Sequence, residues 1–89
     1  MLKIKRHKQF IKDLAKCKIN DQQYTKLILY LSILINKQPL PKEAKDHNLK
    51  GDFIGFRECH ISGDLLLIYK IENNTLNLVR IGTHSQLFK

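Results

Sequence analysis

The chain begins with alternating apolar and charged residues and then changes to a helical period. Residues 2–5 read apolar, charged, apolar, charged, which is typical of a short half-buried strand. From about His7 the apolar residues recur on one side of a helix and lysines fall opposite them. We expect the inner face of this first helix to carry Phe10, Ile11, Leu14 and Ala15.

A second helix is predicted to begin at Asn20, an N-cap residue type, and to end before Pro39 and Pro41. We expect its inner stripe to hold Tyr24, Leu27, Ile28, Leu31, Leu34 and Ile35. Three more apolar residues fall outside that stripe, namely Leu29, Tyr30 and Ile33. This helix is therefore either buried on two sides or offers an apolar face to a partner.

Strand-like segments fill the second half of the chain. A polar connection over residues 38–52 leads to apolar runs at 53–61, 65–71 and 76–81, with short gaps containing Gly or Asn between them. Such gaps signal hairpins, so the three runs form an antiparallel meander. We predict one α+β domain over residues 1–89 with the order β-α-α-β-β-β. Its twisted antiparallel sheet has both helices on one face, and the other face is open to solvent.

The charge of the chain is positive and concentrated in its first half. Lys and Arg number 16 against 8 acidic residues, a net charge of +8. Residues 1–50 hold 12 basic and 4 acidic residues, whereas residues 51–89 hold 4 of each. A one-sided basic surface favours a polyanionic partner such as nucleic acid. A solubilising surface, or one that complements an acidic protein, is the alternative.

The chain has few features of secreted or membrane proteins. Cys17 and Cys59 are too few for a disulfide scaffold, show no zinc spacing and indicate free thiols in a reducing compartment. The first residues lack the apolar stretch of a signal peptide, and the apolar run at 27–35 is too short to cross a membrane. We expect a cytoplasmic protein that is not bound to membranes.

Histidines are the main candidates for chemistry, because the chain has no phosphate-binding glycine loop, no serine elbow and no HExxH motif. His47, His60 and His84 lie in or beside strand ends, and Asp64 follows His60 across a predicted turn. An imidazole can remove the proton of a ribose 2′-OH or protonate the leaving 5′-oxygen. A cation, which Arg57 or Arg80 would supply, stabilises the phosphate charge.

Each candidate also has a plainer interpretation. A single histidine in a small domain is usually a surface or structural residue, and the His and Asp spacings match no compact zinc site. Arg80 can point into solvent from a strand, and Cys59 reads as a packed thiol. Phe88 can close the core, although an aromatic side chain near a chain end can also stack on a base. Spacing and composition lead to a candidate RNA-binding site and no further.

Four segments in the second half carry a resemblance to a known family. Residues 46–51, 55–61, 64–69 and 78–88 resemble, in order, the motifs of the YafQ-type toxins, a branch of the RelE superfamily found in bacterial type II toxin–antitoxin pairs. The four linked motifs lie within residues 46–88, about half of the chain. Two positions depart from the family pattern, because Leu65 stands where the family usually has Trp and Thr83 replaces Ser.

The resemblance implies a toxin that is an mRNA endoribonuclease, depends on the ribosome, needs no metal or cofactor and is held inactive by an antitoxin. It implies His84 as general acid, Asp64 or His60 as the base or its orienting group, and His47 as the residue that completes the set. Phe88 would stack on a nucleobase, and Arg57 and Arg80 would contact phosphate. The lysine-rich first half would lie against ribosomal RNA, and the apolar second helix either meets the antitoxin or fills the core.

Two other functions fit the same sequence. The chain could be a non-catalytic RNA- or ribosome-binding module, in which Leu65 marks lost activity. It could also be a protein-only interaction domain that blocks an acidic partner such as a gyrase-type target, since one fold serves more than one poison. Growth inhibition that persists without His84 and His60 would favour binding over cleavage.

Overall fold

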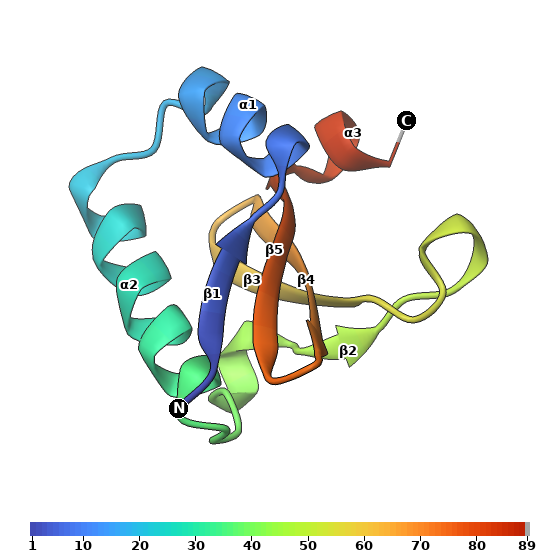
Figure 1. Ribbon diagram of the computed structural model, residues 1–89. Helices are drawn as coiled ribbons and strands as arrows, with labels where there is room; N and C mark the ends of the chain where they lie inside the picture. The colour runs from blue at the N-terminus through green and yellow to red at the C-terminus, as the bar shows by residue number, and fades with distance from the viewer. Residues whose placement is uncertain (89) are drawn as a thin grey trace.

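In the computed structural model, which describes residues 1–88, three helices surround a five-stranded sheet (Figure 1). The helices are α1 (Lys8–Lys16), α2 (Asp21–Ile35) and α3 (His84–Leu87). The strands are β1 (Lys3–Arg6), β2 (His47–Asn48), β3 (Arg57–Ser62), β4 (Leu65–Glu72) and β5 (Thr75–Thr83), and two 3₁₀ turns lie at Lys42–Ala44 and Gly51–Phe53. The α+β class and the order of the main elements are confirmed.

The strands run in the spatial order β1-β5-β4-β3-β2. The pairs among β2, β3, β4 and β5 are antiparallel, as the hairpin signals predict. The turn between β4 and β5 has positive φ at both Asn73 and Asn74, the conformation of a two-residue hairpin turn. These two residues therefore set the register of β4 and β5 next to the turn, and the register shifts by one residue between Ile68 and Tyr69.

One strand pair differs from the predicted antiparallel sheet. β1 pairs with β5 in parallel, so the sheet is mixed and that part of the prediction is wrong. Two helices follow β1 and return the chain to its starting end, where the Leu2 N–H donates to the carbonyl of Ile35 at 2.8 Å. Because no tight turn joins β1 to its neighbour, the hairpin pattern does not set its direction.

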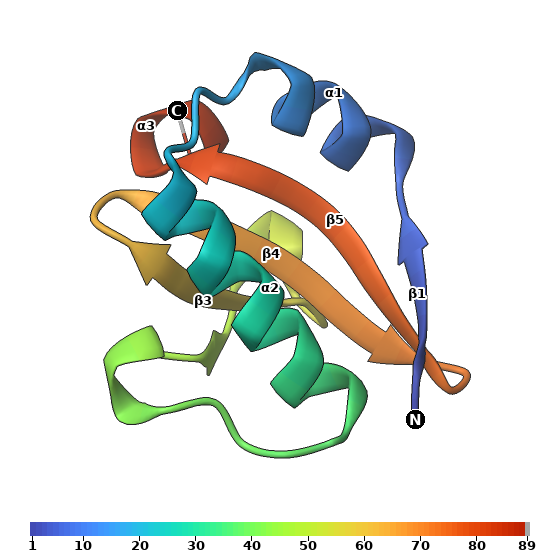
Figure 2. The same ribbon diagram turned by 90° about the vertical axis from the view of Figure 1, so that its left-hand side faces the viewer.

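Both long helices cover one face of the sheet, as predicted, and α2 crosses in front of it in Figure 2. The main core joins Phe10 of α1 to three residues of α2 and to the inner residues of β3, β4 and β5. On α2 the buried residues are Leu27, Tyr30 and Leu34. Asn20 caps this helix, and its side chain and that of Gln23 form a reciprocal capping box.

The inner faces of both helices are rotated from their predicted positions. On α2, Tyr30 is 1% exposed and belongs to the core, whereas Tyr24 and Ile28 are 54% and 49% exposed. Leu29, one of the three apolar residues outside the predicted stripe, is exposed as well. On α1, Phe10 is buried, but Ile11 is exposed. The helix face that contacts the sheet is thus centred on Leu27, Tyr30 and Leu34, and α2 leaves an apolar strip uncovered.

The opposite face of the sheet is not open, contrary to the prediction. Leu66 and Ile68 of β4 are 1% and 0% exposed there. A small second core covers them, formed with the α3 end of the chain and the segment between β2 and β3. Residues 53–56 were expected to begin a strand, but they form a turn whose Phe53 ring lies 5.6 Å from that of Phe88, edge to face.

Two buried tyrosines differ in how their hydroxyl groups are satisfied. Tyr69 donates to the carboxylate of Asp46 at 2.5 Å, whereas the hydroxyl of Tyr30 has no hydrogen-bond partner within residues 1–88. We expect Tyr30→Phe to raise the free energy of unfolding by about 1 kcal/mol, because it removes an unsatisfied buried group. The same change at Tyr69 should lower that free energy by about 1–2 kcal/mol. Urea denaturation of the two variants measures both, and a destabilised Tyr30→Phe would contradict the assignment.

No helix in residues 1–88 combines the length and the apolar character needed to cross a bilayer.

Candidate functional site

The residues proposed from the sequence fall into two groups on the sheet face that lies opposite α1 and α2. The two-histidine cluster consists of His47, His60 and Glu58, on neighbouring strands β2 and β3. The α3 cluster consists of Asp64, His84 and Phe88, from the β3–β4 turn and the C-terminal helix. Each group is held by different elements of the fold.

Strand register builds the two-histidine cluster. His47 is the cross-strand partner of Glu58, and His60 lies two residues further along β3, on the same face as Glu58. Both imidazoles point their Nε2 atoms at one oxygen: Oε1 of Glu58 lies 3.7 Å from His47 and 3.4 Å from His60. One carboxylate oxygen thus lies within ion-pair distance of both imidazole rings.

Glu58 is the member of this cluster that was not predicted from the sequence. It is the only buried charged residue among residues 1–88, with 4% exposure, whereas the side chains of His47 and His60 are 50% and 34% exposed. A buried carboxylate needs partners that donate hydrogen bonds or carry charge. The alternation of β3 could have revealed it, because Glu58 and His60 are two residues apart.

A short loop contact fixes the second nitrogen of His47. Its Nδ1 lies 2.6 Å from the carbonyl oxygen of Lys45, a residue in the left-handed backbone region. A carbonyl oxygen only accepts, so Nδ1 carries the proton and donates to it, which leaves Nε2 of neutral His47 as a proton acceptor. The backbone carbonyl therefore fixes the orientation of the His47 ring, and Nε2, which faces Glu58, must itself be protonated for the two side chains to form an ion pair.

A capping box builds the α3 cluster. The Thr83 side chain accepts from the Gln86 N–H, and the Gln86 side chain accepts from the Thr83 N–H at 2.8 Å, so α3 begins directly after β5. This helix was not predicted from the sequence, although Thr83 and Gln86 have the spacing of a capping box. Asp64 accepts from the backbone N–H of His84 at 3.4 Å, and the rings of His84 and Phe88 are 5.1 Å apart.

The two clusters are neighbours across β4. His60 pairs with Leu66, and Leu66 pairs with Gly82, two residues before His84. With strands about 4.8 Å apart, the backbone of His60 lies about 10 Å from that of Gly82. Leu66 and Ile68 form a buried apolar floor beside the clusters. Side chains from the two groups therefore border a common surface rather than touching each other.

Arg57 lies outside both clusters. Its position three residues before His60 puts it on the helix-covered face, where its guanidinium binds the carboxylate of Asp46 at 3.1 Å and 3.2 Å and the amide oxygen of Asn48 at 2.8 Å. The hydrogen bond to Asp46 raises the pKa of Arg57, while burial and hydrogen bonding to Asp46 raise the pKa of Tyr69. This network ties the segment before His47 to the sheet.

Arg80 is likewise paired with a carboxylate. Its Nε donates to Oδ2 of Asp13 at 2.7 Å, and the same carboxylate accepts from the Ile81 N–H. Burial acts to raise the pKa of Asp13, but the hydrogen bonds from Arg80, Gln9 and Ile81 outweigh it, and the pKa is lowered. The pair fastens α1 to the free edge of β5.

The remaining reactive side chains are not placed for catalysis. Burial raises the pKa of Cys59 to about 12, so its thiol stays protonated at neutral pH. Burial and the charge of Asp13 also raise the pKa of Cys17. Within residues 1–88 no three ligand-type side chains are placed to hold a metal ion. His7 bonds to Asn77 between β1 and α1, away from both clusters.

The sequence is similar to one family of bacterial toxins, both by family model and by individual relatives. A family model described as the bacterial toxin of type II toxin–antitoxin systems, YafQ, matches residues 2–89. The mRNA interferase toxin YafQ of Escherichia coli K12 is 38% identical over 81 residues, covering 90% of this chain and 88% of that protein.

Two solved structures show the same fold. A metal-bound toxin from Helicobacter pylori has a TM-score of 0.85 and 45% identity, covering 99% of this chain and all of that one. The toxin in the E. coli DinJ–YafQ complex has a TM-score of 0.83 and 38% identity, with full coverage of both chains.

Proposed function

Because the chain belongs to the YafQ family of bacterial type II toxins, we propose that it is an endoribonuclease that cuts messenger RNA on the ribosome. The observation that carries the proposal is the arrangement of His47, His60, Asp64 and His84 around one surface, with an aromatic ring beside them. Histidines and carboxylates are the groups that RNA cleavage by 2′-OH attack requires.

The α3 cluster suits the departing side of the reaction. Protonated His84 gives its proton to the 5′-oxygen as the P–O bond breaks, and its ring is exposed at the start of α3. The ring of Phe88 lies tilted beside that of His84, and an aromatic ring in this place can stack on a nucleobase. Asp64 contacts the backbone of His84 and so fixes the start of the helix that carries this imidazole.

The two-histidine cluster suits the attacking side. His60, or Asp64 at the end of the same hairpin, removes the proton of the 2′-OH, and the 2′-oxygen then attacks phosphorus to give a 2′,3′-cyclic phosphate. His47 completes the set beside the phosphate, where a protonated imidazole also stabilises negative charge. Glu58 orients both rings through its Oε1. Arg57 and Arg80 hold carboxylates, so the phosphate charge falls mainly to the imidazoles.

An antitoxin and ribosomal RNA are the proposed partners. The homologous toxin in the DinJ–YafQ complex binds an antitoxin. On this chain the exposed apolar strip of α2, which holds Tyr24, Ile28 and Leu29, is a candidate part of that interface. The lysines of β1 and α1 form the basic surface that suits sequence-independent contact with ribosomal RNA phosphates.

The chemistry of the products tests the proposal. Cleavage of mRNA on purified ribosomes should leave 2′,3′-cyclic phosphate or 3′-phosphate ends, and EDTA added to the toxin alone before mixing should not reduce its rate. The EDTA treatment is included because the homologous toxin from Helicobacter pylori was crystallised with metal bound. Loss of cleavage after chelation, restored by adding a divalent ion, would show that the proton-transfer mechanism is incomplete. Products with 3′-hydroxyl ends would reject it.

A further inference from the structure

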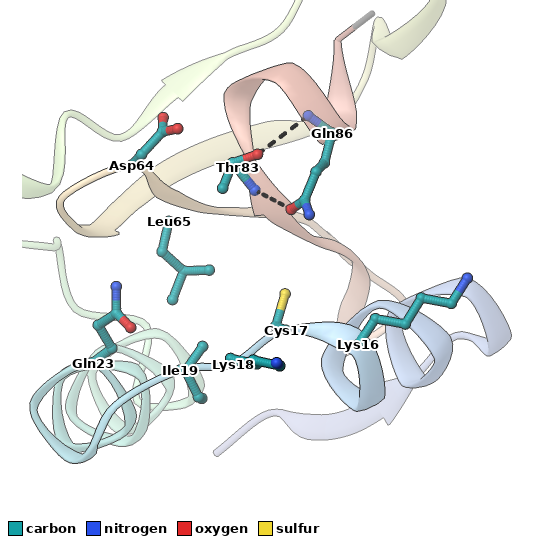
Figure 3. A pocket seen from close by; sticks show the side chains of 9 residues that line it. All are labelled: Lys16, Cys17, Lys18, Ile19, Gln23, Asp64, Leu65, Thr83 and Gln86. Atoms are coloured by element: carbon teal, nitrogen blue, oxygen red, sulfur yellow. Dashed lines mark hydrogen bonds between the residues drawn. The ribbon is translucent and has the colours of Figure 1, made fainter.

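A cavity of about 320 Å³ lies beside the α3 cluster, between the segment that follows α1 and the ends of β4 and β5 (Figure 3). The β3–β4 turn closes one side of it and the start of α2 another. Asp64 and Thr83, which flank the α3 cluster, are also part of its wall. The cavity lies on the helix side of the sheet and meets the proposed active surface at Asp64 and Thr83, at the ends of β4 and β5.

The wall combines three kinds of side chain. Leu65, Ile19 and Cys17 supply an apolar lining. Gln86 contributes an amide whose oxygen is used in the capping box, while its nitrogen has no hydrogen-bond partner within residues 1–88. Lys16 and Lys18 border the cavity, and neither forms an ion pair in the part of the chain that the structure describes.

This combination selects a class of ligand. Two lysines against the one carboxylate of Asp64 leave the wall positively charged, which favours an anion, and the apolar lining favours a flat or apolar body that is buried with it. A free amide NH₂ group adds a hydrogen-bond donor for a heteroatom on that body. A nucleotide has all three parts, namely a phosphate, a planar base and acceptors on the edge of the base. The volume lies at the small end of the range for ligand pockets and fits one such unit.

The cavity continues into a groove. A second hollow of about 180 Å³ shares Lys16, Cys17 and Gln86 with it and extends along α1 to Arg80. Lys18 and Lys16 thus lie in succession along the groove, which ends at the Arg80–Asp13 ion pair, and a row of cations suits a path that follows a single strand of nucleic acid. A single small molecule would fill only one of the two connected hollows.

We propose that the cavity is a nucleotide subsite for the RNA strand next to the scissile phosphate. The base lies against Leu65 and Ile19, and Lys16 and Lys18 contact its phosphates. The subsite rests on the proposed ribonuclease function, and it assigns the basic end of α1 to the mRNA substrate rather than only to ribosomal RNA.

Binding of a non-cleavable oligonucleotide tests the subsite without requiring cleavage. A 2′-O-methyl RNA tetranucleotide is titrated into the full-length chain, and methyl NMR signals are followed. The Ile19 and Leu65 methyl groups should shift, whereas Ile28 on the outer side of α2 and Ile71 at the far end of β4 should not. An oligonucleotide with one abasic position should lose the Ile19 and Leu65 shifts. Saturable binding that leaves those two methyl groups unchanged would overturn the subsite.

Paired charge variants separate local contact from overall charge. Lys16→Ala with Lys18→Ala should weaken oligonucleotide binding about tenfold near 0.1 M salt. Lys8→Ala with Lys12→Ala removes the same charge from α1 outside the cavity, and we expect less than about a threefold effect. Equal losses in both pairs would reject the subsite. If cleavage depends on His84 while the methyl shifts are absent, the subsite fails and the ribonuclease function stands. Methyl shifts at Ile19 and Leu65 without any mRNA cleavage would support the subsite and reject the ribonuclease function.

Discussion

Replacing His84 by alanine should lower the rate of mRNA cleavage by about 10²- to 10⁴-fold, the usual range for loss of a general acid. The 5′-oxygen is a poor leaving group unless it is protonated as the bond breaks, and His84 is the imidazole on the α3 side of the surface. Because the side chain of His84 is exposed, its removal should change the free energy of unfolding little. Single-turnover cleavage on ribosomes gives the rate.

His7 provides the matched control for this experiment. It is the one histidine outside the two clusters. It lies between β1 and α1, and its ring forms a hydrogen bond with Asn77 of β5. His7→Ala should therefore keep the cleavage rate within about threefold of the unchanged chain, while costing about 1 kcal/mol of stability. Cleavage by His84→Ala at an undiminished rate would remove His84 from the mechanism, and growth arrest that survives it would favour the non-catalytic binding module.

The strands of the second half were predictable because local signals agree there. Alternation and the Asn73-Asn74 turn specify β4 and β5 together, and the positive φ of both asparagines shows why that residue type occurs at the turn. The orientation of α2 was not predictable in this way. Its sequence offers two apolar stripes, one through Tyr24 and Ile28 and one through Leu27 and Tyr30. Only the position of the sheet decides between them.

The candidate site shows the same division between local and distant information. The parity of β3 places Glu58 and His60 on one face and Arg57 on the other, so the separation of Arg57 from the histidines could have been predicted. The convergence on Glu58 could not, because it depends on β2, a two-residue strand within a segment without periodicity. Likewise, α3 is too short for a helical period to appear in the sequence, and only the capping-box residues Thr83 and Gln86 indicate a helix there.

Glu58 should act as a positioning residue whose charge matters for catalysis. Glu58→Gln keeps the size of the side chain but removes the anion that faces both Nε2 atoms. The lost charge–charge contact is worth about 1.4–2.8 kcal/mol at this nearly buried position, so kcat should fall by about 10- to 100-fold. KM should change little, because Glu58 is buried beneath the imidazoles and does not reach the RNA.

Two measurements distinguish positioning from a purely structural role. The ¹⁵N chemical shifts of the His47 and His60 rings should change in Glu58→Gln, which reports altered tautomer or protonation at the two imidazoles. Glu72→Gln is the matched control, since it makes the same change on an exposed carboxylate paired only with Lys70, and it should leave kcat and both rings unaffected. If Glu58→Gln lowers stability but preserves kcat and the ring shifts, then Glu58 serves the fold, and the two histidines act without it.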